Sequence, residues 1–196
     1  MKPETNFVSL DLEFNQPSRK IIQVGVSIGN PTQDDSAYLV RKWDVRIDEP
    51  INPEIVDLTG ISTEDNEQGT TLAVVAAELG SLLTETKAFV NPVTWGGGDS
   101  TALLEAFASE GLDFAHFGRR WIDVKTMTGF LALSHHTGPR SMSGGLSSIM
   151  GRYKLSFKGK AHRADVDAFN TLRLFFAVVK RQQKLEMAAA MFKEYF

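Results

Sequence analysis

Near the N-terminus, apolar and polar residues follow one another in the pattern that the strands of a sheet require. Three such segments occur in succession, over residues 7–14, 20–29 and 37–46. The second contains IIQVGVSIG, an almost continuous apolar run that is typical of a strand covered on both faces. The turn-forming residues NPTQDD separate it from the third segment and predict a hairpin. We therefore expect the chain to open as an antiparallel meander.

Beyond the meander, helical spacing alternates with short apolar runs. NPEIVDLTGIS predicts a short helix that begins at Pro53 and stops at Gly60. Further elements are expected as a helix over 70–86, a strand over 87–95, a helix over 99–109, a strand over 120–124, helices near 125–134 and 144–153, and a last helix from about 164 that breaks before KLEMAAAMFKEYF. This order predicts an α/β fold in which helices flank a mixed sheet, as a single domain over residues 1–196.

Composition narrows the possible classes of protein. The 196 residues are 42% hydrophobic, carry a net charge of −3 and include no cysteine, which excludes disulfides and thiolate metal sites. No apolar run approaches the ~20 residues of a membrane span, so we expect a soluble, cytoplasmic protein without a membrane partner. Six basic residues and no acidic ones lie between Arg140 and Arg163. A solvated loop explains such a cluster, and so does a phosphate-binding surface.

Two carboxylates interrupt the first strand. Side chains alternate across a strand, so Asp11 and Glu13 point the same way, with Cα atoms about 6.5 Å apart. Like charges at that distance raise each other's pKa unless a cation lies between them, and Mg²⁺ takes oxygen ligands of this kind. A solvent-exposed sheet edge would explain the pair equally well.

Three more residues have both an ordinary explanation and a chemical one. Asp99 follows three glycines between a strand and a helix, where it is either a helix N-cap or a ligand that another group approaches closely. His162 and Asp167 are five residues apart and converge only if His162 lies in the loop and Asp167 in the first helical turn. Asp165 is then the expected N-cap. Otherwise, His162 is a surface histidine and Asp167 a carboxylate favoured at a helix N-terminus.

In this order, the residues resemble those of the DEDDh 3′–5′ exonucleases, which have a ribonuclease H-like fold. The resemblance is carried by LDLEF, VTWGGGDSTALLEAF and GKAHRADVDAFNTLRLF, with INPEIVDLTGIS between the first two, and extends over residues 7–179. Within the family, the sequences TWGGGD and LTGIS are most similar to the exoribonuclease branch that includes the enhancer-of-RNA-interference and sporulation-inhibitor enzymes.

The resemblance implies hydrolysis of single-stranded RNA or DNA from a free 3′ end to 5′-mononucleotides. It implies that two Mg²⁺ or Mn²⁺ ions are held by Asp11, Glu13, Asp99 and Asp167, with His162 as the general base. It also implies substrate contacts from Leu12, Phe14, Asn15, Leu58, Thr59 and Arg163. The alternatives are a catalytically silent nucleic-acid-binding module and a polymerase-associated proofreading subunit. The segment after Val179 either docks a partner or packs on its own domain, and a homodimer is one option.

Overall fold

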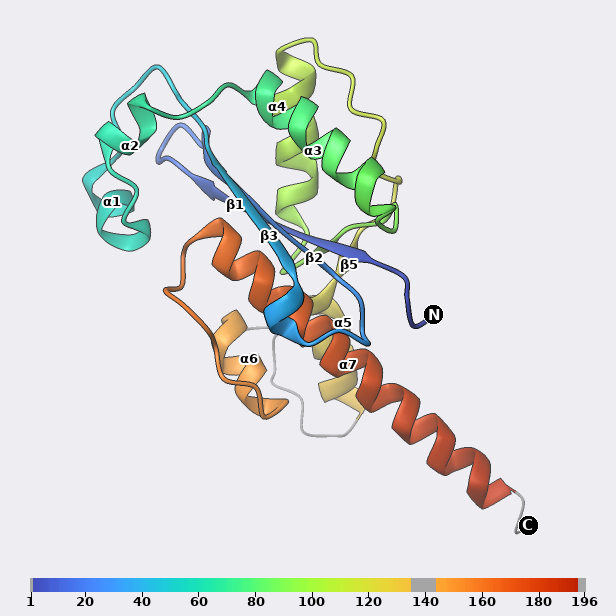
Figure 1. Ribbon diagram of the computed structural model, residues 1–196. Coiled ribbons are helices and arrows are strands. Elements are labelled where there is room, and N and C mark those ends of the chain that lie inside the picture. Colours follow the sequence, from blue (N-terminus) through green and yellow to red (C-terminus); the bar gives the residue numbers. More distant parts are fainter. Residues whose placement is uncertain (1, 135–143, 194–196) are drawn as a thin grey trace.

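One mixed sheet organises the computed structural model, which describes residues 2–134 and 144–193 (Figure 1). In spatial order, its five strands are β3 (Leu39–Asp44), β2 (Ile21–Gly29), β1 (Phe7–Phe14), β4 (Val93–Thr94) and β5 (Ile122–Asp123). The β1–β2 and β2–β3 pairs are antiparallel, whereas β1–β4 and β4–β5 are parallel. The predicted antiparallel meander is therefore confirmed, and β1 occupies the centre of the sheet.

Helices cover both faces of this sheet (Figure 1). They are α1 (Pro53–Thr59), α2 (Thr63–Glu67), α3 (Leu72–Thr86), α4 (Gly98–Ser109), α5 (Val124–Ser134), α6 (Leu146–Arg152) and α7 (Ala164–Lys193), with a 3₁₀ turn η1 (Asp35–Ala37) before β3. α3 and α4 lie on one face, and α7 lies on the other with α5 and α6. α1 and α2 lie beside one end of the sheet, on a small core around Ile22 and Ile61.

The alternation of side chains along β1 divides the buried core into two. Val8, Leu10 and Leu12 belong to the cluster that includes residues of α3 and α4. Phe7 belongs to the other cluster, with residues of α6 and α7 such as Leu172. Because Asp11 and Glu13 have the same parity as Phe7, the pleat directs them to the face that α7 covers.

Several elements differ from the expectation, each for a local reason. The expected strand over 87–95 is reduced to two residues, since Pro92 has no N–H to donate and three glycines follow Trp95. The helix α2 was not expected, although Ser62 and Asp65 form the capping box that starts it. The predicted break in the last helix is wrong: α7 runs for 30 residues, and no proline or glycine interrupts it.

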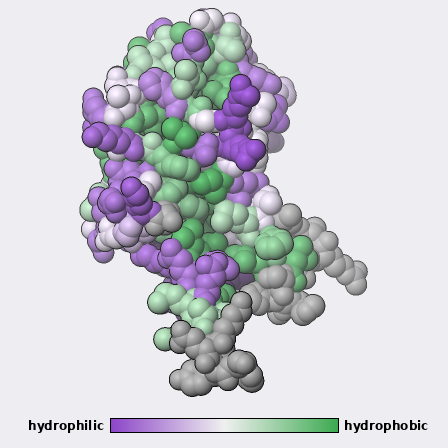
Figure 2. Space-filling view, turned by 90° about the vertical axis from the view of Figure 1, so that its right-hand side faces the viewer, coloured by the Kyte–Doolittle hydropathy of each residue, from purple (hydrophilic) through white to green (hydrophobic). Residues whose placement is uncertain are grey.

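The C-terminal part of α7 extends beyond the body of the molecule (Figure 1). Every residue over 180–191 is exposed, including the large apolar side chains of Leu185, Met187 and Met191. On the face of the molecule drawn in Figure 2, hydrophobic side chains also lie at the surface, between polar ones. No helix in the described ranges is long and apolar enough to cross a membrane. Where it leaves the body, α7 still contacts the domain, since the guanidinium carbon of Arg181 lies 5.5 Å from the ring centroid of Tyr153. The partner that the exposed residues beyond it would dock stays a prediction.

Candidate active site

The central strand supplies the first two carboxylates. Asp11 and Glu13 are partly buried near the end of β1, on the face that α7 covers. On the neighbouring strand β2, Gly25 lies opposite Asp11 and Gln23 lies opposite Glu13. The explanation by an exposed sheet edge is therefore excluded, because β1 is flanked by strands on both sides.

The third carboxylate lies in the first turn of α4. The helix begins at Gly98 with Gly97 as its N-cap, so Asp99 is not the capping residue. The turn before the helix is tight, since Gly96 has a φ of 98° and the Thr94 hydroxyl donates to its carbonyl at 2.7 Å. Asp99 is close enough to Asp11 for its negative charge to raise the pKa of that carboxyl.

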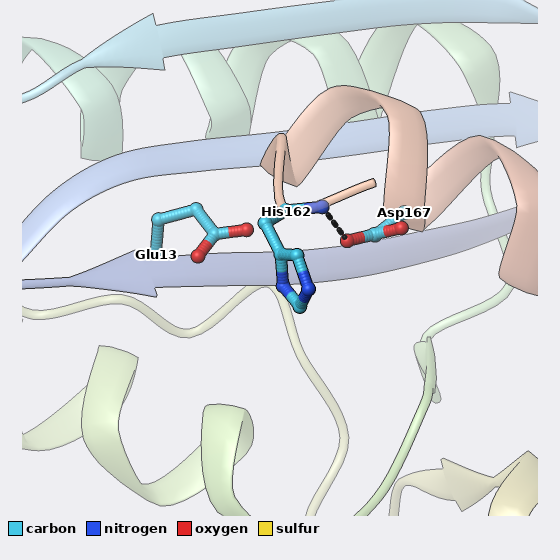
Figure 3. Close-up of side chains that lie close together, drawn as sticks. All are labelled: Glu13, His162 and Asp167. Atoms are coloured by element: carbon cyan, nitrogen blue, oxygen red, sulfur yellow. Dashed lines mark hydrogen bonds between the residues drawn. The ribbon is translucent and has the colours of Figure 1, made fainter. Parts of the chain in front are cut away.

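The last two residues of the set come from the start of α7. His162 lies in the preceding loop with a φ of 62°, and its backbone N–H donates to Oδ2 of Asp167 at 2.9 Å. Potential ligand atoms of Glu13, His162 and Asp167 lie within 4.8 Å of one another, and Figure 3 shows the three side chains gathered between β1 and α7. The expected convergence of loop histidine and helical aspartate is thus present. Asp165 as the N-cap is wrong, because α7 already begins at Ala164.

All four carboxylates have raised pKa values, and burial is the first cause in each case. Burial, and then repulsion by Asp99, Asp167 and Glu13, raises the pKa of Asp11 well above its usual value. Burial followed by repulsion from Asp167 and Asp99 raises the pKa of Glu13 to about 7, against the opposing charge of Arg163. Burial raises the pKa of Asp99 to about 7. Burial also raises that of Asp167, against the bond from the His162 N–H.

These four carboxylates fit divalent cations. Their oxygens are the hard ligands that Mg²⁺ and Mn²⁺ prefer, and cations between them would oppose the burial and repulsion that raise these pKa values. We therefore assign Asp11, Glu13, Asp99 and Asp167 as the residues that could hold a metal.

Polar residues buried in α7 hold the loop that carries His162. The Asn170 amide donates to the carbonyl of Lys158 at 2.8 Å and accepts from the N–H of the same residue at 3.1 Å. Arg173 donates to the carbonyl of Ser156 at 2.8 Å and to Asp35 at 2.6 Å. Sequence reasoning missed this clamp, although an Asn and an Arg on the apolar stripe of α7 were a readable signal.

Three of the expected substrate contacts have accessible side chains. Leu58 is 46% exposed on α1. Arg163 is partly buried, and its charge reaches Glu13. Phe14 is partly buried at the end of β1, with the guanidinium carbon of Arg19 5.6 Å from its ring centroid. These positions remain predictions as binding residues.

The side chains of the other three expected substrate contacts are buried, and these positions also remain predictions as binding residues. Leu12 packs in the core beneath α3 and α4. Asn15 donates to Glu49 at 2.7 Å and accepts from the N–H of Asn52 at 2.8 Å, which ties it to the N-cap of α1. The Thr59 hydroxyl donates within α1 and accepts from the next loop. Each of these side chains is thus engaged in packing or hydrogen bonds within the protein.

The sequence over residues 8–175 matches the model of the RNase T exonuclease family. The chain belongs to this family. The resemblance to exonucleases that the motifs carried is thereby confirmed. A search of curated protein sequences found no significant match.

Solved structures resemble this exonuclease over most of its length. The nuclease domain of 3′hExo, a DEDDh family member bound to rAMP, has a TM-score of 0.75 at 16% identity, over 92% of this chain and 94% of that one. Cell-death related nuclease 4 has a TM-score of 0.75 at 17% identity, over 91% and 65%. S. pombe Pop2p with Mg²⁺ and Mn²⁺ bound has a TM-score of 0.63 at 21% identity, over 89% and 83%. The expected ribonuclease H-like α/β fold is confirmed.

The raised carboxyl pKa values make the metal-free exonuclease less stable at higher pH. Glu13 and Asp99 titrate near 7 in the folded state but near 4 when unfolded, so folding takes up protons between these values. Their stabilising contribution is complete below about pH 4 and is lost as pH rises through 7. In EDTA, we expect the melting temperature to fall by several degrees from pH 5 to pH 8, with about 2–4 °C per kcal/mol. Excess Mg²⁺ at pH 8 should reverse the fall, and a melting temperature that rises over this range in EDTA would contradict the assignment.

Removing one charge from the cluster should stabilise the metal-free protein. Asp11→Asn keeps the shape of the side chain and ends its repulsion with the other three carboxylates. We expect a higher melting temperature in EDTA at pH 8 and loss of the increase that Mg²⁺ gives the wild type. The control is Asp57→Asn on the exposed surface of α1, which should change neither. A large drop for Asp11→Asn would show instead that this carboxylate is structural.

Proposed function

We propose that this exonuclease removes 5′-mononucleotides from the 3′ end of single-stranded nucleic acid in a metal-dependent reaction. One observation carries the proposal: Asp11, Glu13, Asp99, His162 and Asp167, from three distant parts of the chain, meet at one end of the sheet. The DEDDh neighbour with rAMP bound and another neighbour described as a 3′-exonuclease recognising histone mRNA support RNA as the first substrate to test.

Each residue has a distinct part in the proposed reaction. Two Mg²⁺ or Mn²⁺ ions, held by the four carboxylates, would supply the charge that lowers the pKa of the attacking water and stabilises the leaving oxygen. Asp11 is the central ligand, because the other three carboxylates all act on its pKa. A ring nitrogen of His162 accepts the proton of the attacking water, a task that suits a side chain with a near-neutral ordinary pKa.

Side chains around this cluster are suited to a single strand. Arg163 provides positive charge beside Glu13, and Lys160 lies against the end of α1, with Nζ 2.9 Å from where a Cβ of Gly60 would be. Leu58 and Phe14 offer apolar surface on which terminal bases could stack without sequence readout. Of the basic segment expected from the sequence, Arg140 lies outside the described residues, and Lys158 is paired with Asp35.

A proofreading subunit is the second candidate. It is favoured by the exposed apolar side chains of Leu185, Met187 and Met191 on the protruding part of α7, which a polymerase partner would cover. The two proposals share the same chemistry and differ in whether the isolated chain meets its substrate alone.

The direction of degradation tests the proposed reaction. We expect 5′-labelled single-stranded oligomers to shorten stepwise with Mg²⁺ or Mn²⁺, to release 5′-mononucleotides and to be stable in EDTA. A 3′-phosphorylated oligomer should resist, since the site is expected to receive a 3′ hydroxyl. RNA and DNA of matched sequence, run side by side, measure the sugar preference. Efficient cleavage of a circular single strand would rule the proposal out.

A substitution of His162 tests whether this residue acts as a general base or as a metal ligand. His162→Ala should lower the rate by about 10²–10⁴-fold while Mn²⁺ affinity stays near the wild-type value. Rising pH should recover part of the rate, because hydroxide replaces the missing base. His162 as a ligand predicts instead weaker Mn²⁺ binding that saturating Mn²⁺ overcomes. The control is His116→Asn, an exposed histidine beside Gly80 of α3, which should leave both unchanged.

A further inference from the structure

A fully buried glutamine lies next to the catalytic carboxylates and has no part in the reaction described above. Gln23 lies in the middle of β2 and is 0% exposed. It is paired with Glu13 on one side and with Asp44 of β3 on the other. Its side chain shares the face of β2 that α7 covers, since it bonds to the first residue of that helix. Buried polar side chains need partners, and those of Gln23 show what it holds.

Gln23 joins the sheet to the first turn of α7. Its Oε1 accepts a hydrogen bond from the backbone N–H of Ala164, the first residue of the helix, at 2.9 Å. Its Nε2 donates to Oδ1 of Asp44 at 2.5 Å, and the other oxygen of Asp44 accepts from Lys42 at 2.6 Å. The first N–H groups of a helix have no partner within the helix, so a side chain from the sheet caps α7.

Gly25 allows the helix to begin directly on the strand. A Cβ at this position would lie 2.0 Å from the carbonyl carbon of Ala164 and 2.1 Å from the nitrogen of Asp165. Both are backbone atoms, which cannot move aside without moving the helix. Since Gly25 pairs with Asp11, the start of α7 is held one strand away from the central carboxylate.

We propose that Gln23 is a positioning residue of this active site, which sets where Asp167 and His162 stand relative to Asp11 and Glu13. The proposal rests on the proposed function for the meaning of that geometry. Apolar contacts of α7 hold it against the sheet, but apolar packing has no preferred direction and restrains sliding along the helix axis weakly. A hydrogen bond is directional, and this one ends three residues before Asp167.

The test compares two substitutions of Gln23 with a control on the same strand. Gln23→Leu removes both bonds at similar volume, whereas Gln23→Glu keeps an acceptor for the Ala164 N–H. Val26→Ala opens a cavity on the opposite face of β2, in the core beneath α3 and α4. For each variant, calorimetry measures Mn²⁺ affinity, cleavage of a 5′-labelled single-stranded oligomer measures kcat and KM, and hydrogen exchange measures protection of the Ala164 amide.

We expect Gln23→Leu to bind Mn²⁺ about 10–100-fold more weakly, which is the loss typically seen when a residue that orients metal ligands is mutated. Its kcat should fall with little change in KM, and its Ala164 amide should exchange faster. Gln23→Glu should keep the protection of the Ala164 amide closer to that of the wild type, although its carboxyl can donate to Asp44 only when protonated. Val26→Ala should lower the melting temperature and leave Mn²⁺ affinity and the Ala164 amide as in the wild type.

Wild-type Mn²⁺ affinity and kcat in a folded Gln23→Leu would overturn the positioning role while leaving the proposed function intact. Equal losses in Val26→Ala would also overturn it, because the effect would then come from stability alone. If Gln23→Leu does not fold, the same readouts on Gln23→Glu decide: loss of Ala164 protection without loss of Mn²⁺ affinity contradicts the proposal. A wild type that neither binds Mn²⁺ nor cleaves would refute the proposed function, and the Ala164 amide would still report whether Gln23 holds α7.

Discussion

The burial of four neighbouring carboxylates is the constraint on which the rest of this structure depends. Asp11, Glu13, Asp99 and Asp167 each have a raised pKa, with burial as the first cause. Groups that destabilise the folded state at neutral pH can be kept in place only by structure that is stable for other reasons. Here that structure is the central strand of the sheet, with an apolar core on each face.

The fold also places favourable electrostatic surroundings near the cluster. Asp99 lies in the first turn of α4 and Asp167 in the first turn of α7. Helix N-termini carry partial positive charge, which stabilises nearby anions, typically by 0.3–1 kcal/mol. Two helices therefore begin where the charge is most negative, but this contribution is too small to offset burial, and the carboxyl pKa values remain raised. A divalent cation bound by these carboxylates, as proposed, would offset what remains.

The sequence was sufficient to predict features that depend on neighbouring residues in the chain. It was not sufficient to predict which side chains are buried, or which contacts they make there. The pleat of β1 placed Asp11 and Glu13 together, and spacing placed His162 in a loop ahead of Asp167. Burial depends on which distant segments cover a residue, and the local sequence pattern does not show this. It therefore did not predict that Asn15 accepts a hydrogen bond from Asn52 at the start of α1, or that Gln23 accepts one from the first residue of α7. The resemblance supplied the remaining assignments, and those for Leu12, Asn15 and Thr59 fall on side chains whose burial the local pattern did not reveal.

The proposed metal ligands and the proposed base are held by different kinds of structure. Carboxylates come from a central strand and from first helical turns, whereas His162 comes from a loop that Asn170 and Arg173 clamp through its backbone. His162 itself has a positive φ, which is uncommon for a residue with a side chain, and this turn aims its N–H at Asp167. The backbone of residue 162 therefore orients a carboxylate while its side chain is exposed. A substitution of the side chain leaves that N–H in place, so position 162 allows the proposed proton-accepting role to be tested without dismantling the carboxylate cluster.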